Sequence, residues 1–287
     1  MLSQEEKNMY LSSLFGGAIG GLVVDVVLFP LDTLKTRLQS GLGFRKSGGF
    51  SGIYKGIGPQ AVGSAPQAAF FFLTYESFKY YIEPQVGPHS LPLVYMTGAS
   101  ISEVIACLIR VPMEVVKQRR QITTNHKHTS LRILKHAIKS EGIINGLYRG
   151  FGSTIIREVP FSLIQFPVLE YLKSTYRIKF KNNIPLESWE VANCGAIAGG
   201  FAAALTTPLD VAKTRIMLAD KKTAEKMRVR TVLKQIYREQ GIKGLFAGFA
   251  PRVLWITLGG YVFFGMYDFS KNFCNDYLLD SEFEINR

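Results

Sequence analysis

Long stretches without charged residues divide the chain into hydrophobic segments. Twenty uncharged residues separate Lys55 from Glu76, and another 19 separate Glu83 from Glu103. Residues 191–209 carry no charge either. A membrane-spanning helix needs about 20 mostly apolar residues, so the pattern predicts an all-α membrane protein. The six predicted membrane helices cover residues 9–38, 58–82, 91–121, 152–178, 189–218 and 249–274.

The connections between these segments differ in charge. Those after the first, third and fifth predicted helices contain many basic residues, such as Arg45, Lys127 and Lys221, whereas residues 83–90 contain none. Basic loops mark the inner side of a membrane, so we place these loops inside and both termini on the opposite side. This placement accounts for most of the net charge of +12. Because the chain has no nucleic-acid-binding motif, we expect no nucleic-acid partner.

Few residues suggest catalytic chemistry. Cys107, Cys194 and Cys274 lie far apart and form no zinc-binding pattern. We find no nucleophile paired with a base, no metal cluster and no glycine-rich phosphate loop. We therefore expect no metal and no cofactor, and we set aside a membrane enzyme or redox sensor.

A motif of the form Pro-x-acid-x-x-Lys-x-Arg occurs three times, beginning at Pro30, Pro112 and Pro208. A second motif containing glycine follows each copy, and an acid with a lysine three residues later comes near the end of each even-numbered helix. Repetition at this spacing indicates a repeated structural unit. The chain is predicted to be three two-helix repeats, at residues 1–87, 88–184 and 185–287.

The spacing within the motif has a direct physical meaning. A proline inside a helix removes one backbone hydrogen bond and kinks the helix. The acid and the lysine three residues later lie on one face, and isolated charges in a membrane are costly. We therefore expect three kinked helices to converge in a ring, where each acid reaches a base on a neighbouring helix. The ring residues are Asp32, Lys35, Glu114, Lys117, Asp210 and Lys213.

The tripled motif resembles the signature of the mitochondrial carrier family, and the resemblance extends over essentially the whole chain. It implies a bundle with threefold pseudosymmetry and short helices along the matrix surface. It also implies a monomer in the mitochondrial inner membrane that alternates between a cytosol-open and a matrix-open state. Both termini would then face the intermembrane space, and the partners would include bilayer lipids such as cardiolipin.

The resemblance assigns the ring to a gate on the matrix side. Gln39 and Gln121 occupy positions where family members brace this gate, whereas the third such position is Met217, so two braces are expected. The matrix gate would pair Asp32 with Lys117, Glu114 with Lys213, and Asp210 with Lys35.

A second gate would lie on the cytosolic side, also by resemblance. It would use the acid and the lysine near the end of each even-numbered helix. The cytosolic gate would pair Glu76 with Lys173, Glu170 with Lys271, and Asp268 with Lys79.

Two further acids are expected in the cavity between the gates. Asp25 precedes Asp32 by seven residues and Glu103 precedes Glu114 by eleven, so each shares a helical stripe with a ring acid. Intramembrane carboxylates are functional candidates by default. We therefore expect Asp25 and Glu103 to point into one cavity, and we interpret Arg110 as a structural or gate residue.

The fourth predicted helix contains the adjacent pair Arg157 and Glu158. This pair is similar to the substrate contact of family members that carry molecules resembling amino acids. Gly63 and Ile256, with Trp255 beside it, occupy the corresponding places on the second and sixth helices. Neither Gly63 nor Ile256 can bind a phosphate.

The expected cavity contains three acids and one base, and this net negative charge disfavours phosphate-rich or dicarboxylate cargo. It suits a zwitterion with an extra positive charge, with an aromatic such as Trp255 or Tyr261 stacking on a planar ring. S-adenosylmethionine has these features. Val24-Asp25-Val26 and Arg157-Glu158-Val159-Pro160-Phe161-Ser162 also resemble the family branch that carries this compound, which implies exchange for S-adenosylhomocysteine.

Two other functions stay open. A carrier for a basic amino acid would use the same acids, and an uptake assay with lysine, arginine and ornithine separates it. A carrier that leaks protons would use the intramembrane carboxylates without any cargo.

Overall fold

The computed structural model of the protein describes residues 4–87, 91–124, 129–181, 184, 186–219 and 227–262. These residues form helices and turns and contain no strand, which confirms the all-α prediction for this part of the chain. The long helices are α1 (Gln4–Gln39), α2 (Ile57–Ile82), α3 (Leu91–Ile122), α5 (Phe151–Phe180), α6 (Ser188–Leu218) and the segment Phe249–Val262.

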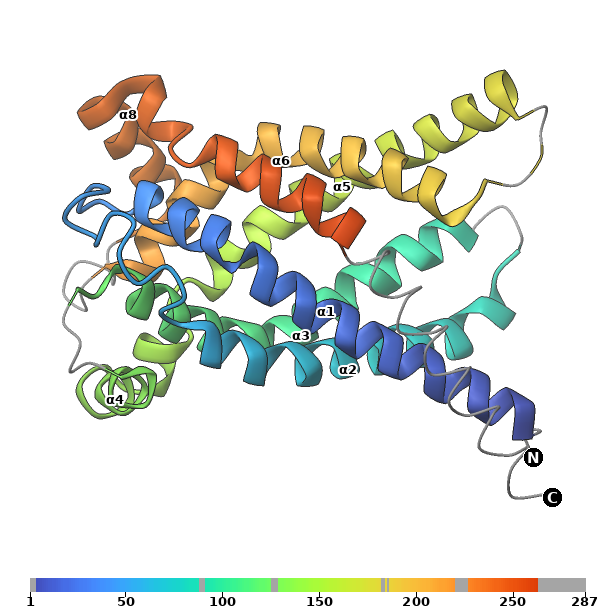
Figure 1. Ribbon diagram of the computed structural model, residues 1–287, viewed down its shortest axis with the longest axis horizontal. Helices are drawn as coiled ribbons and strands as arrows, with labels where there is room; N and C mark the ends of the chain where they lie inside the picture. Colours follow the sequence, from blue (N-terminus) through green and yellow to red (C-terminus); the bar gives the residue numbers. More distant parts are fainter. Residues whose placement is uncertain are drawn as a thin grey trace.

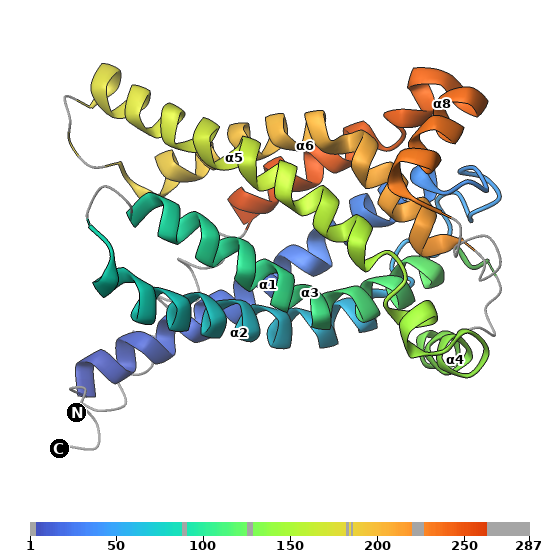
Figure 2. The ribbon, with the colours of Figure 1, turned by 180° about the vertical axis from the view of Figure 1, so that it is seen from behind.

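The long helices run roughly along the longest axis of the molecule (Figures 1 and 2). Helix α2 packs along α3, and α5 packs along α6. The short helices α4 (Ser130–His136) and α8 (Val229–Leu245) gather at one end, together with residues 40–56. The predicted helix bounds agree closely with those observed, except that residues 263–274 of the last prediction lie outside the described residues.

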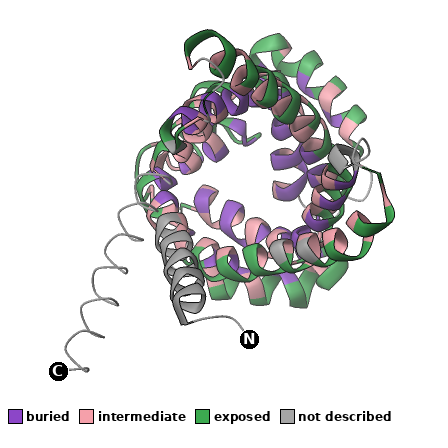
Figure 3. Cartoon of the chain, turned by 90° about the vertical axis from the view of Figure 1, so that its right-hand side faces the viewer, coloured by how far each residue is buried: buried purple, intermediate pink, exposed green. Residues whose placement is uncertain are grey.

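The bundle buries many charged and polar side chains beside its apolar core and exposes many large apolar side chains on its outside. Seen along its length, the helices form a ring whose buried residues face inward and whose exposed residues face outward (Figure 3). Leu73 is 67% exposed and Ile197 60%, whereas Arg37, Asp210 and Lys213 are at most 2% exposed. A soluble protein has the opposite arrangement, since its charged residues are almost never fully buried unless paired.

Helix composition alone identifies fewer membrane spans than the sequence predicts. In the described part of the chain, only Trp189–Leu218 is long and apolar enough to cross a membrane by itself. The pair Val229–Leu245 and Phe249–Val262, bent by 54°, could count as a second span. The other long helices carry charges in their interiors, such as Asp25 in α1 and Glu103 in α3.

The connection between α1 and α2 contains no helix, whereas the connections after α3 and α6 contain the short helices α4 and α8. Residues 40–56 form turns, in which Gly43, Gly48, Gly49, Gly52 and Gly56 have positive φ. Glycine adopts this left-handed conformation at little cost, and it interrupts a right-handed helix.

This glycine-rich connection encloses the buried side chain of Arg37. The guanidinium donates to the backbone carbonyl of Gln121 at 2.9 Å, of Gly49 at 2.7 Å and of Gly52 at 3.2 Å. A Cβ atom on Gly48 would lie 3.3 Å from the guanidinium carbon. The carbonyl cage around Arg37 therefore connects the end of α3 to the first connection.

Candidate functional site

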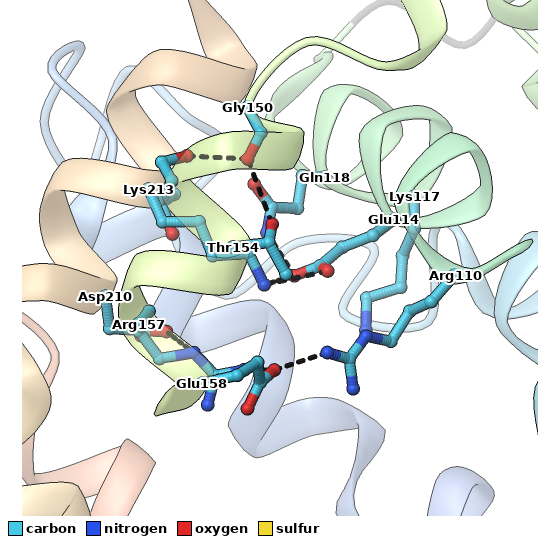
Figure 4. A network of polar contacts seen from close by, with 12 residues as sticks. Arg110, Glu114, Lys117, Gln118, Gly150, Thr154, Arg157, Glu158, Asp210 and Lys213 are labelled. Carbon is cyan, nitrogen blue, oxygen red and sulfur yellow. Dashed lines mark hydrogen bonds and ion pairs between the residues drawn. The ribbon is translucent and has the colours of Figure 1, made fainter. Parts of the chain in front are cut away.

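Helices α1, α3 and α6 bring six charged residues together where the three repeated motifs meet. Lys117 Nζ lies 3.0 Å from Asp32 Oδ2, and Lys35 Nζ lies 2.8 Å from Asp210 Oδ2. Lys213 Nζ lies 2.7 Å from Glu114 Oε1, a contact drawn in Figure 4. All three interhelix pairs expected from the sequence are in contact. We call these six residues the ion-pair ring.

Glutamine side chains support the acids of the ring. Gln121 donates to Asp32 at 2.8 Å, and Gln39 donates to Asp210 at 2.8 Å. The third acid, Glu114, accepts a hydrogen bond from Gln118 of its own helix at 2.9 Å. The sequence did not point to Gln118, and two supporting glutamines were expected.

Met217 explains why the third support comes from a different position. It is fully buried in an apolar cluster with Cys107, Val111 and Val115. A glutamine in this cluster would need a hydrogen-bond partner there. Gln118 differs from Thr36 and Thr214 at the same motif position, and this difference was the available sequence signal.

Arg252 is a ring partner that sequence reasoning missed. Its side chain is 2% exposed, lies 2.5 Å from Asp210 Oδ1 and donates to Thr206 Oγ1 at 2.8 Å. Arg157 Nε approaches the same Asp210 oxygen at 3.9 Å. Asp210 therefore has more cationic neighbours than a ring of three simple pairs would provide.

Gln60 is a second contact that was missed. It accepts a hydrogen bond from Lys117 at 3.0 Å and donates to Asp25 at 3.0 Å. Gln60 and Arg252 each lie four residues after the glycine that precedes the helix, Gly56 and Gly248. This shared register was the signal that could have identified both.

A cavity of about 440 Å³ opens beside the ring, within the range of small-molecule sites. Its lining combines ring residues with other residues of α2, α5 and Phe249–Val262, both apolar, such as Phe161, and polar, such as Gln165. Tyr261 does not line it and contacts Asn193 through its hydroxyl. The predicted substrate residues in its lining are Gly63, Arg157, Glu158, Trp255 and Ile256.

The other two predicted substrate residues do not share this cavity, so that expectation is corrected. Glu103 lines a smaller cavity of about 170 Å³, which also borders Glu158 and Cys107. Asp25 lines neither cavity and is held by Gln60. The helical repeat was the basis for placing both acids in one cavity. It did not account for Arg110, whose side chain contacts Glu103 at 2.5 Å.

Arg110 also contacts Glu158, as Figure 4 shows, and it lines the larger cavity. Its assignment to a purely structural or gate role is therefore incomplete. The described lining contains six basic residues against four acidic ones, which leaves two positive charges. The prediction of a net negative cavity is wrong, because Arg110 and Arg252 line this cavity whereas Asp25 and Glu103 do not; the ring adds three acids and three bases, which cancel.

Charges at the far end of the bundle make different contacts. Lys173 pairs with Glu170 of its own helix at 2.8 Å, and Lys79 lies 5.8 Å from the ring centre of Tyr95. The side chain of Glu76 and all of Asp268 and Lys271 lie outside the described residues. The three cytosolic pairs therefore stay predictions.

The sequence matches the family model described as "Mitochondrial carrier protein" at residues 6–47, 43–85, 89–180 and 185–278. Three similar proteins have names that specify a cargo. The "S-adenosylmethionine mitochondrial carrier protein homolog" of Drosophila melanogaster is 54% identical, over 93% of this chain and 95% of that protein.

Two vertebrate proteins are named "Mitochondrial S-adenosylmethionine carrier protein". That of Xenopus tropicalis is 53% identical, over 92% of this chain and 96% of its own length. That of Mus musculus is 50% identical, over 92% of this chain and 94% of its own length.

Proposed function

Because the chain belongs to the mitochondrial carrier family, and is a transporter rather than an enzyme, we propose that it carries S-adenosylmethionine across the mitochondrial inner membrane in exchange for S-adenosylhomocysteine. The observation that carries the cargo assignment is the identity of 50–54% to proteins named for this compound, over nearly the whole chain. The cavity is consistent with it, because acidic, basic and aromatic side chains meet there.

The proposed membrane arrangement has six spans in three repeats, at residues 1–87, 88–184 and 185–287, with both termini facing the intermembrane space. The apolar exterior and charged interior of the bundle support it. The internal charges do not oppose insertion, since the described ring acids and bases are paired. The ring closes within one chain, so the proposed carrier is a monomer.

Lipid contacts of the proposed carrier include cardiolipin. A cavity of about 770 Å³ at the ring end is lined by Arg149, Arg228 and Arg230, beside the backbone of Gly150 and Gly152 at the start of α5. Arginines beside a helix start suit a phosphate group.

The proposed binding mode divides the cargo among the cavity walls. Arg157 binds the carboxylate and Glu158 the ammonium group. Trp255 stacks on the adenine ring, and Ile256 provides an apolar contact. Gly63 lines the cavity on α2 and lets Met113 pack closely against that helix, because a Cβ atom there would lie 2.9 Å from Met113 Cγ.

The ion-pair ring is proposed to act as the matrix gate, with Gln39 and Gln121 as braces, so the structure represents a matrix-closed state. Cargo binding would influence the gate through Arg157, which contacts Glu158 on one side and approaches Asp210 at 3.9 Å on the other. A carboxylate that binds Arg157 draws it away from Asp210 and weakens one side of the ring.

The test is exchange by purified protein in liposomes loaded with S-adenosylmethionine. We expect external labelled S-adenosylmethionine and S-adenosylhomocysteine to enter, and lysine, arginine, ADP and malate to have little effect. Because the cavity lining is net positive and ADP is an anion, ADP is the competitor that tests the cargo assignment most strictly. Efficient ADP exchange, or uptake of basic amino acids alone, would contradict the proposal, and proton flux without cargo would indicate a leak.

The binding mode predicts that Arg157→Ala loses exchange by about 30-fold or more, because removing one partner of a buried charge pair costs roughly 2–5 kcal/mol of binding. The measurement is the initial exchange rate at low cargo concentration. Arg132→Ala, at an exposed residue of α4, is the control. Near-normal exchange by Arg157→Ala would remove Arg157 from the site.

A further inference from the structure

One nitrogen atom of Arg110 contacts two carboxylates that come from different helices. Arg110 Nη2 lies 2.5 Å from Glu103 Oε1 on α3 and also contacts Glu158 Oε1 on α5. The same nitrogen donates to Cys107 Sγ at 3.3 Å. Glu103 and Glu158 are therefore close enough to bind one compact cation between them.

This cluster lies where the two cavities meet. Glu158 borders both cavities, Glu103 borders the smaller one and Arg110 borders the larger one. The side chains are 26%, 10% and 23% exposed for Glu103, Glu158 and Arg110, so a small solute can reach them. Among the described residues, Glu103 forms an ion pair with Arg110 alone.

We propose that Arg110 is an internal cation, which occupies a cation subsite formed by Glu103 and Glu158 until the cargo displaces it. The inference rests on the proposed function and names the part of the cargo that this subsite selects. The methionine part of S-adenosylmethionine has two cationic centres, the ammonium and the sulfonium. Two carboxylates around one position match a compact group with two positive charges.

The displaced guanidinium can form new contacts. Its Nε atom is buried and has no hydrogen-bond acceptor in the described structure. The cargo also carries a carboxylate, which Arg110 can bind when it leaves the two acids. Ion pairs are then exchanged rather than lost, and no charge is left unpaired in a largely buried place.

The subsite would give the carrier a way to distinguish its two cargoes. S-adenosylhomocysteine is a neutral thioether and offers only the ammonium, so it competes less well with Arg110. The positively charged cargo should therefore depend on Glu103 and Arg110 more strongly than the neutral one does. This makes Arg110 and Glu103 specificity-determining residues.

The experiment compares the half-saturating concentrations of the two cargoes in liposome exchange, for wild type, Arg110→Gln and Glu103→Gln. Arg110→Gln leaves the two carboxylates without their cation, and they attract the doubly charged cargo more strongly than the singly charged ammonium of the other. This variant should therefore raise the preference for S-adenosylmethionine over S-adenosylhomocysteine by about ten-fold, which corresponds to about 1.4 kcal/mol. Glu103→Gln should lower the preference by a similar factor. Arg132→Gln, at an exposed residue of α4, controls for the loss of one positive charge.

If both variants change the half-saturating concentrations of the two cargoes by the same factor while wild type still exchanges both cargoes, this inference is wrong. The proposed function would then still stand. A wild-type protein that binds neither cargo would overturn the proposed function and this inference with it. If Arg110→Gln does not fold, Glu103→Gln decides the question, since an unchanged preference in that variant contradicts the subsite.

Discussion

The two ends of the helix bundle hold their charges in different ways. At the ring end, acids and bases from different helices are paired and largely buried; Asp210 and Lys213 are 2% exposed. At the far end, Glu170 and Lys173 pair within one helix, with side chains 69% and 32% exposed. Exposed pairs typically contribute about 0–1 kcal/mol, whereas removing one partner of a buried pair costs roughly 3–5 kcal/mol. The described ring pairs are therefore expected to stabilise the observed structure more than the pair of Glu170 and Lys173 does.

The ring itself is uneven. Asp210 contacts Lys35, Gln39 and Arg252, whereas Asp32 contacts Lys117 and Gln121. The difference arises because Phe249–Val262 contributes a buried arginine beside Asp210. Arg252 and Asp210 both belong to the third predicted repeat, so the threefold pattern of the sequence conceals an additional ion pair within that repeat.

The largest effect is expected from Asp210→Asn, because it leaves the buried cation of Arg252 and the partly buried cation of Lys35 without their carboxylate. We expect the closed state to lose roughly 3–5 kcal/mol. The measurements are thermal unfolding in detergent and the initial exchange rate in liposomes. Glu170→Gln at the far end is the matched control. Equal unfolding temperatures for the two variants would contradict the difference between the ends.

An intermediate effect is expected from charge reversal within the ring. Asp32→Lys with Lys117→Asp restores an opposite-charge pair and should recover measurable exchange. Asp210→Lys with Lys35→Asp should recover less, since the new lysine faces Arg252 and Arg157. Double-mutant cycles on exchange rates should give coupling energies of about 0.5–3 kcal/mol for the first pair. Better recovery in the second pair would show that Arg252 does not hold Asp210.

The smallest effect is expected at the far end. Glu170→Gln should change the unfolding free energy by less than about 1 kcal/mol, because the pair it breaks is exposed. Its effect on the exchange rate is a separate measurement, and a loss of exchange without a loss of stability would support the proposed cytosolic gate. A large loss of stability would instead mean that Glu170 has partners beyond Lys173.

The helices and the ring residues could be predicted because local pattern determines them, whereas the partner of each ring acid came from the family resemblance. Charge gaps mark the helix bounds, and the three-residue spacing of acid and lysine directs both to one face, as for Asp32 and Lys35. Contacts supplied by α2 and by Phe249–Val262 could not be predicted in the same way. Arg252 and Gln60 reach the ring only because separate segments pack together.

The glycine-rich connection and the cavity show two other limits. No structure was predicted for the connection where Gly48 and its neighbours adopt positive φ, although its glycines were a local signal for turns. Asp25 and Glu103 were placed in one cavity from helix period alone. That reasoning gives a direction around a helix axis, and it cannot account for a side chain such as Arg110 that intervenes.

The carbonyl cage around Arg37 has a consequence for tolerance to substitution. Arg119 and Arg149 both pair with Glu141, at 2.9 and 2.8 Å, so replacing that one carboxylate weakens two contacts. The partners of Arg37 are backbone carbonyls, including those of Gly49 and Gly52, and they remain when a side chain elsewhere is replaced. A single side-chain change can therefore loosen the connection that follows α3, whereas the first connection keeps its contact with the end of α3.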